Sequence, residues 1–530
     1  MRVRRSIEDL QNDYSNGNKK PLEDLMRAWK AIKELPAEDP RSFFMLGGFH
    51  GEPFRGGGWG NSAYWGGYCN HGNVLFPTWH RVYLVKLEEA LRSVPGCEDV
   101  TLPYWDETSV ESLTNGIPWA LTNRDFVLDG VTIPNPLRSF VFNKNITDNI
   151  SGDNFRYSKP KGYETVRYPL SGLVGTPEDL AATQAHNAMY PDYDANVKLL
   201  NQNVVTWLNS TVVVAGAPSP GGRVAEKYKD CLDAPNYTVF SNTSSAAQWN
   251  GDHGGSGVPT VQPLESPHNS IHLSVGGFDV PGNFDASPIT GANGDMGEND
   301  TAGLDPIFFF HHCFVDRVFW LWQKKHGFTD SLEIIPEYPG TNSVDSQGPT
   351  PGTAPNSWLT LQSPLDPFML VEHGNSRPYT SADCVNIETQ LNYTYGPGSL
   401  EDQLMTKAAF TATGSPRVVH VSGINRAAIR GSFVVSVFAN IGEKRVLLHT
   451  EAVLSRWSVK YCANCQTHLE VKAFASLRSF PVEQVNQASF DVEIHTRDGK
   501  MTASPLRGAQ TRTLEILPPD NKKLFRIEVR

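Results

Sequence analysis

The chain has 530 residues, and its content of 39% hydrophobic and 10% aromatic residues excludes a disordered protein. Its 46 Lys and Arg against 57 Asp and Glu give a formal net charge of −11, which argues against a nucleic-acid partner and against a basic membrane binder. No apolar run reaches the roughly 18 residues of a transmembrane helix, and no signal peptide is visible, so we expect an intracellular, cytoplasmic protein.

The first part of the chain has the pattern of helices separated by glycine-rich turns. Ser6 followed by Asp9 is typical of a helix N-cap. Apolar residues in 21–35 and in 80–94 recur with the spacing of one helix face. The segment 47–72 between them is rich in Gly and aromatic residues and cannot form a continuous helix.

The middle of the chain is mixed in character. Residues 130–265 hold one clear helix candidate, at 177–189. A second helical block is predicted over 305–326, with Pro306 suited to its first turn. Residues 336–360 are rich in Pro, Gly and Ser, which indicates a surface loop.

The pattern changes again after Tyr393-Thr-Tyr-Gly-Pro-Gly-Ser399. Short runs such as 431–440, 444–449 and 490–495 alternate apolar and polar residues between turn signals, as in a β-sandwich. We therefore expect two unlike domains. The fold class is a mainly α domain followed by a β-sandwich-like C-terminal domain, with bounds 1–396 for the first domain, 397–411 for a linker and 412–530 for the second.

Two groups of histidines stand out among the fifteen in the chain. His268 and His272 have the i, i+4 spacing that puts two imidazoles on one helix face, and the pair His311-His312 follows on the next predicted helix. Three more lie upstream: His50, His71 and His80. Two such groups suggest two metal ions with all-nitrogen coordination.

The ligand chemistry narrows the choice of metal. Neutral imidazole suits Zn, Cu, Fe and Ni. Zinc hydrolase centres generally recruit carboxylates as well, and no ligand-like Asp or Glu falls inside either histidine group. Copper is therefore favoured, with a dinuclear zinc hydrolase as the rival interpretation.

Longer motifs around these histidines resemble those of the type 3 copper proteins, the family of tyrosinases, catechol oxidases and haemocyanin units. Phe76-Pro-Thr-Trp-His80-Arg-Val-Tyr83 with Leu102-Pro-Tyr-Trp-Asp106 is similar to the first copper signature. Asp305-Pro-Ile-Phe-Phe-Phe-His-His312-Cys-Phe-Val-Asp316-Arg317 is similar to the second, and Tyr393-Thr-Tyr-Gly396 resembles the marker that ends the catalytic domain. Within the family the chain most resembles fungal tyrosinase proenzymes with a C-terminal shielding domain.

The resemblance implies a four-helix-bundle core around a dinuclear copper centre. It assigns His50, His71 and His80 to copper A, and His268, His272 and His312 to copper B. His311 is then the neighbour that family members do not use as a ligand. Asp316 sits where a residue outside the ligand set orients the site. Cys69, two residues before His71, matches the cysteine of the Cys–His thioether in fungal members.

The resemblance also implies an activity, with O₂ and small phenols as the substrates. The enzyme would hydroxylate monophenols at the ortho position and oxidise o-diphenols to o-quinones in a melanin-type pathway. Glu265 and Asn269 match the pair thought to hold a water that acts as base, which favours a true tyrosinase over a catechol oxidase. Phe308 occupies the place of a ring that stacks on the substrate, or is a core residue.

The C-terminal domain is implied to block the site until it is removed. Cys462 and Cys465 form a CxxC motif that suits Cu(I), zinc or a disulfide, and it resembles the motif proposed to load copper in fungal proenzymes. Val453 or Leu454 stands where the resemblance predicts a phenylalanine plug. A haemocyanin-like O₂ carrier is the alternative from another class, and a homodimer stays open.

Overall fold

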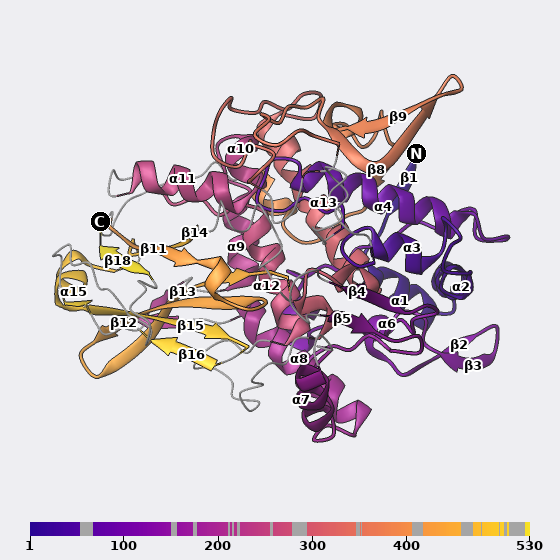
Figure 1. Cartoon of the computed structure of the whole chain (residues 1–530), viewed down its shortest axis with the longest axis horizontal. Helices are drawn as coiled ribbons and strands as arrows, with labels where there is room; N and C mark the ends of the chain where they lie inside the picture. The colour runs from indigo at the N-terminus through magenta and orange to yellow at the C-terminus, as the bar shows by residue number, and fades with distance from the viewer. Residues whose placement is uncertain are drawn as a thin grey trace.

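The computed structural model describes residues 1–53, 67–149, 156–172, 177–209, 212–214, 217–219, 223–254, 258–277, 294–345, 350, 352–404, 417–456, 470–478, 480–497, 499–502, 506–507 and 525–529. In the described residues the helices lie mostly in the first two thirds of the chain (Figure 1). They are α1 Ile7–Ser15, α2 Lys20–Glu34, α3 Phe43–Gly48, α4 Phe76–Arg92, α5 Val110–Asn115, α6 Trp119–Thr122, α7 Pro177–Asn187, α8 Tyr193–Asn209, α9 Val224–Cys231, α10 Tyr237–Ser241, α11 Thr243–His253, α12 Glu265–Gly276, α13 Ile307–His326 and α15 Val482–Gln487.

The strands gather in the C-terminal region. Those before it form short two-stranded pairs: β1 Arg2–Arg4 with β10 Tyr393–Tyr395, β2 Asp125–Leu128 with β3 Val131–Pro134, β4 Ile146–Asn149 with β5 Arg156–Lys159, β6 Val212–Val214 with β7 Ala217–Ser219, and β8 Pro364–Glu372 with β9 Asn375–Thr380. The later strands are β11 Val418–Asn425, β12 Phe433–Ile441, β13 Lys444–Val453, β14 Glu470–Ser476, β15 Ser489–Thr496, β16 Gly499–Thr502, β17 Leu506–Arg507 and β18 Arg526–Val529.

Two sheets make up the C-terminal region. One has the order β14-β11-β18, and the other has the order β13-β12-β15-β16 with β17 beside β15. An apolar cluster that includes Val421, Val435 and Ile494 fills the space between them. This arrangement confirms the predicted fold class of a mainly α region followed by a β-sandwich-like region. The bounds predicted for the domains and the linker stay predictions, since residues 405–416 lie outside the described part.

Local signals place the helices that carry the histidines. The Ser6 hydroxyl accepts a hydrogen bond from Asp9 N at 3.0 Å and begins α1 as predicted. α4 begins at Phe76, one turn before the predicted start, and α13 begins directly after Pro306. α4 packs against α13, and α13 against α12, so the motifs that contain His80, His268 and His312 meet in the helical core.

The helix content of residues 130–265 was underestimated from the sequence. α7 lies at the predicted position, but α8, α9, α10 and α11 are additional. In α8 the buried face includes Asn196 and Asn203, and Asn203 Nδ2 donates to Ser274 O at 2.8 Å. The search for apolar periodicity misses such a helix because buried, hydrogen-bonded amides interrupt the pattern.

The helical and β-rich regions share one core. Val434, Phe438 and Leu454 of the C-terminal region belong to the same apolar cluster as α4 and α13. β13 packs on α12, the helix with two of the six histidines (Figure 1). Among the described helices, none has both the length and the apolar character needed to cross a bilayer.

Candidate metal centre

The first histidine group lies around the end of α3 and the start of α4. His50 follows α3, His71 lies in the loop before α4, and His80 is in the second turn of α4; all three are buried. The ring centroid of His71 lies 5.2 Å from that of His50 and 5.1 Å from that of His80. Three imidazoles therefore face a common space.

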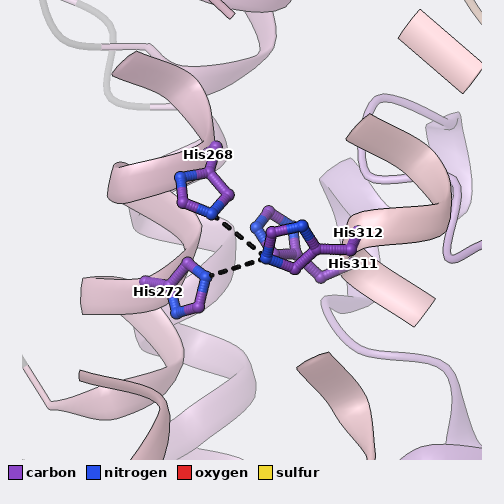
Figure 2. Close-up of side chains that lie close together, drawn as sticks. All are labelled: His268, His272, His311 and His312. Atoms are coloured by element: carbon purple, nitrogen blue, oxygen red, sulfur yellow. Dashed lines mark hydrogen bonds between the residues drawn. The ribbon is translucent and has the colours of Figure 1, made fainter. Parts of the chain in front are cut away.

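The second group comes from two facing helices. His268 and His272 lie one turn apart on α12, and their Nε2 atoms lie 3.1 Å and 3.4 Å from Nε2 of His312 on α13 (Figure 2). Such close approach of three nitrogens, all buried, is the arrangement of ligands around one metal ion.

The two groups face each other across the core. The rings of His80 and His312 stack, with centroids 4.3 Å apart and an interplanar angle of 14°. The centroids of His71 and His268 lie 5.5 Å apart. The structure thus brings together all six histidines that the sequence motifs singled out.

Backbone carbonyls fix the direction of three of these rings. Nδ1 lies 3.0 Å from Asn299 O in His50, 2.8 Å from Phe76 O in His80 and 2.8 Å from Met296 O in His272. A carbonyl oxygen only accepts hydrogen bonds, so each Nδ1 donates its proton and leaves Nε2 with a lone pair.

Several buried histidine nitrogens that have no hydrogen-bond partner in the described part of the chain are suited to bind a metal ion. Nε2 of His50, His71 and His80 is buried without a hydrogen-bond partner among the described residues. A buried polar atom of this kind requires an explanation, and a bound copper ion supplies the missing partner. The six imidazoles therefore fit a pair of copper ions.

Burial keeps the imidazoles neutral, the form that binds metal. Burial, with a smaller contribution from neighbouring His272 and His311, lowers the pKa of His80 to about 3. The pKa values of His50, His71, His268, His272 and His312 are all well below the ordinary value, again chiefly because burial disfavours the charged form.

His311 lies beside the second group but has partners of its own. Its Nδ1 lies 2.6 Å from Glu107 Oε1, and the Tyr228 hydroxyl donates to Glu107 Oε2 at 2.7 Å. Burial lowers the pKa of His311 to about 3 and raises that of Glu107 well above its usual range. Glu107 was not singled out from the sequence, although it directly follows the motif that ends at Asp106.

Cys69 lies with the first group. Its sulfur and one nitrogen each of His50 and His71 lie within 4.8 Å of one another. The thiol is buried, and burial raises its pKa. The side-chain amide of Asn299 lies 3.6 Å from the sulfur.

Asp316 lies on α13, one turn beyond His312, and its carboxylate binds residues outside the histidine groups. Its Oδ1 pairs with Arg81 Nε at 2.6 Å, and its Oδ2 accepts from the hydroxyls of Tyr393 at 2.5 Å and Tyr395 at 2.7 Å. Because Arg81 follows His80 directly, this pair connects α4 with α13.

The three residues predicted to act on the substrate lie at the site. Glu265 Oε1 accepts from Gly72 N at 2.8 Å, and Asn269 Oδ1 lies 3.0 Å from His268 Nδ1. Phe308 stacks on His312, with ring centroids 4.0 Å apart, and is fully buried.

The C-terminal region covers this part of the molecule. A cavity of about 80 Å³ lies between the two regions, with Gly72 and Asn269 on one side and Arg426, Glu451 and Val453 on the other. Leu454 is fully buried in the shared core. Cys462 and Cys465 lie outside the described residues.

Comparisons with known proteins identify the family. Residues 40–325 match the model of the common central domain of tyrosinase. A tyrosinase of Hahella sp. (strain CCB-MM4) is 54% identical over 519 residues, which cover 94% of this chain and 92% of the relative. The chain belongs to the tyrosinase family. It is a tyrosinase or polyphenol oxidase that uses a dinuclear copper centre and O₂.

The likeness extends beyond the central domain. A tyrosinase of Aspergillus oryzae is 44% identical over 526 residues, which cover 93% of each chain. A solved tyrosinase from Burkholderia thailandensis has 52% sequence identity and a TM-score of 0.82, and the match covers 93% of this chain and 95% of that one. The C-terminal region of the tyrosinase is therefore shared with its relatives.

Proposed function

We propose that this tyrosinase is a latent enzyme that hydroxylates monophenols at the ortho position and oxidises o-diphenols to o-quinones in a melanin-type pathway. The observation that carries this proposal is the set of six buried, neutral imidazoles in two facing groups. The cover formed by the C-terminal region supports latency.

In this proposal His50, His71 and His80 hold copper A, and His268, His272 and His312 hold copper B. When bound, the copper pair supplies the redox chemistry that activates O₂. The protein keeps the imidazoles neutral and aims Nε2 at the metals through the carbonyls of Phe76, Met296 and Asn299. His311 stays outside the proposed ligand set, as the family resemblance implies, and its Nδ1 lies 2.6 Å from Glu107 Oε1. Cys69 is proposed to form the thioether with His71, which would fix that ring.

Copper content tests the ligand assignment. His272→Ala removes one ligand of copper B, and His80→Ala removes one of copper A. Each variant is expected to retain one copper ion per chain instead of two, as measured by elemental analysis of the purified full-length protein. The control is His326→Ala, which should retain both ions: His326 lies at the end of α13, where its Nε2 donates to Leu232 O at 2.9 Å. Two retained ions in either ligand variant would contradict the assignment.

Glu265 and Asn269 are proposed to act on the phenol. Asn269 borders the cavity beside His268, and Glu265 lies one turn earlier on α12. Together they would hold a water that removes the phenolic proton, a step that monophenols need before transfer to copper. Phe308 would present its ring to the substrate from the wall of the site.

The ratio of two activities tests this role. In protein trimmed of its C-terminal region, Asn269→Ala is expected to reduce tyrosine hydroxylation by about 10²-fold or more, the typical contribution of general base catalysis. DOPA oxidation should fall much less, because a diphenol is already ionised more easily. Equal losses of the two activities in Asn269→Ala would contradict the base-positioning role. If the unsubstituted protein oxidises DOPA but does not hydroxylate tyrosine, it is a catechol oxidase.

Val453 or Leu454 is proposed as the plug: Val453 lines the cavity between the two regions, and Leu454 is buried in the core that they share. The full chain should therefore oxidise DOPA slowly, and limited proteolysis in the segment before β11 should raise the rate. Reversible binding of O₂ without turnover after this cleavage would instead indicate an oxygen carrier.

A further inference from the structure

One short segment, residues 296–300 between α12 and α13, contacts both histidine groups. Met296 O accepts the hydrogen bond from His272 Nδ1 at 2.8 Å, and Asn299 O accepts that from His50 Nδ1 at 3.0 Å. The side chain of Asn299 also reaches Cys69. The segment thus sets the ring direction of one histidine from each group.

The same segment is held by the C-terminal region. The Ser432 hydroxyl donates to Gly297 O at 2.7 Å, and Asn299 N donates to Ser455 O at 3.0 Å. Arg456 Nη1 pairs with Asp300 Oδ1 at 2.9 Å, with side chains only 1% and 0% exposed. The amide of Ser455 in turn donates to the Ser432 hydroxyl at 2.8 Å, which joins these contacts into one unit.

The start of the segment is anchored in the helical region. The Lys159 ammonium and the Tyr163 hydroxyl bind the Asp295 carboxylate at 2.7 Å and 2.6 Å. Gly276 of α12 lies so close that a Cβ there would come within 1.9 Å of Gly297 N. Further along, Asp300 O accepts from Glu52 N of the helical region at 2.8 Å, and Ser432, Ser455 and Arg456 add the contacts from the C-terminal region.

We propose that Ser432, Ser455 and Arg456 are positioning residues for the copper centre, which act through Met296 and Asn299 on His272 and His50. The C-terminal region is then a structural support of the dicopper site as well as its cover. This inference rests on the proposed assignment of His50 and His272 as ligands. It follows that release of the C-terminal region loosens one ligand of each copper ion at the same time.

The rate at which copper leaves the resting full-length protein tests the proposal. Ser432→Ala removes the hydroxyl that bonds Gly297 O, and Arg456→Met removes the charge that holds Asp300. Loss of a group that orients a ligand lowers metal affinity by about 10-fold or more. Each variant is therefore expected to lose copper to a bathocuproine-type chelator, with ascorbate present, about 10-fold faster than the unsubstituted protein.

Arg430→Met is the matched control. Arg430 also joins the C-terminal region to the helical region, through Asp179 of α7 at 3.0 Å. The rate of copper release from Arg430→Met should stay within about twofold of the rate of the unsubstituted protein. This change is well below the effect expected when a group that orients a ligand is lost. A thermal melt of each copper-free protein separates folding from metal retention, and Ser432→Ala decides the matter if Arg456→Met fails to fold.

The outcomes separate this inference from the proposed function. Unchanged copper release in a folded Ser432→Ala variant would overturn the inference and leave the ligand assignment intact. Equally fast copper release from Arg430→Met would also overturn it. Any weakening of the contact between the C-terminal and helical regions would then be enough to speed copper release. Failure of the unsubstituted protein to hold two copper ions would instead contradict the proposed function.

Discussion

Glu265 illustrates how single residues at this site serve the structure before they serve any reaction. Its two carboxylate oxygens accept from Gly72 N and Thr243 N, both at 2.8 Å, and the Thr243 hydroxyl adds a bond of 3.0 Å. Burial raises its pKa, while these hydrogen bonds lower it again in part. The carboxylate therefore holds the loop of His71 against the start of α11.

Removal of the Glu265 carboxylate should lower the free energy of unfolding of the copper-free protein. Glu265→Ala leaves the buried amides of Gly72 and Thr243 unpaired, at a cost of about 1–3 kcal/mol in the free energy of unfolding. Urea denaturation of the copper-free protein measures this loss. Glu226→Ala on α9 is the control: it breaks only surface ion pairs with Arg223 and Lys229, and it should cost about 1 kcal/mol or less. Equal losses in both variants would contradict the structural role of Glu265.

At the scale of elements, a buried ionic network fixes α4 against α13. Arg81 of α4 and Arg4 of β1 both approach Asp316 of α13, at 2.6 Å and 3.6 Å. The hydroxyls of Tyr393 and Tyr395, on β10, complete the shell around the carboxylate. The network explains why an arginine directly after His80 and an aspartate one turn after His312 belong to the motifs: they set the distance between α4 and α13.

Loss of the central charge should be costly. Asp316→Asn leaves Arg81 buried without its counter-ion, whereas Arg4 keeps its pair with Glu88 at 2.9 Å. Breaking a buried pair in this way costs about 3–5 kcal/mol. The isosteric control is Asp129→Asn, since Asp129 is 61% exposed and forms a surface pair with Arg27; it should cost about 1 kcal/mol or less. Chemical denaturation of both copper-free variants makes the comparison. A loss below about 1 kcal/mol for Asp316→Asn would show that the network is not needed.

At the scale of the whole molecule, charged groups are buried where β13 meets α12. Glu451 Oε2 accepts from the Ser266 hydroxyl at 3.1 Å, and the Lys227 ammonium donates to Ser266 Oγ at 3.3 Å and to Thr450 O. Burial alone would raise the pKa of Glu451, but the Lys227 charge and the hydrogen bonds from His449 and Ser266 outweigh it, so the pKa lies below the ordinary value of 4.5.

Acid should therefore weaken the cover. A carboxyl whose pKa is lowered on folding contributes stability that is complete above pH 4.5 and is lost as the pH falls through its folded-state pKa. We expect the full chain to lose part of its latency below this folded-state pKa and to regain it on return to neutral buffer, as measured by DOPA oxidation at each pH. Glu451→Gln lacks this contribution at every pH and should be active without acid. Glu443→Gln, at an exposed turn, should behave as the unsubstituted chain; unchanged latency in Glu451→Gln would contradict the prediction.

The sequence by itself determined the family, the fold class, the helices with clear apolar periodicity and the six histidines, because these depend on local spacing and on long motifs. It missed α8, where buried amides interrupt the apolar pattern, and the shorter helices α9, α10 and α11. It also missed Glu107, whose role depends on His311, 204 positions away in the chain. Only the tertiary structure decided that residues 296–300 connect both histidine groups to the C-terminal region. No motif records such a link, because most of its contacts go to backbone carbonyls, which every residue carries.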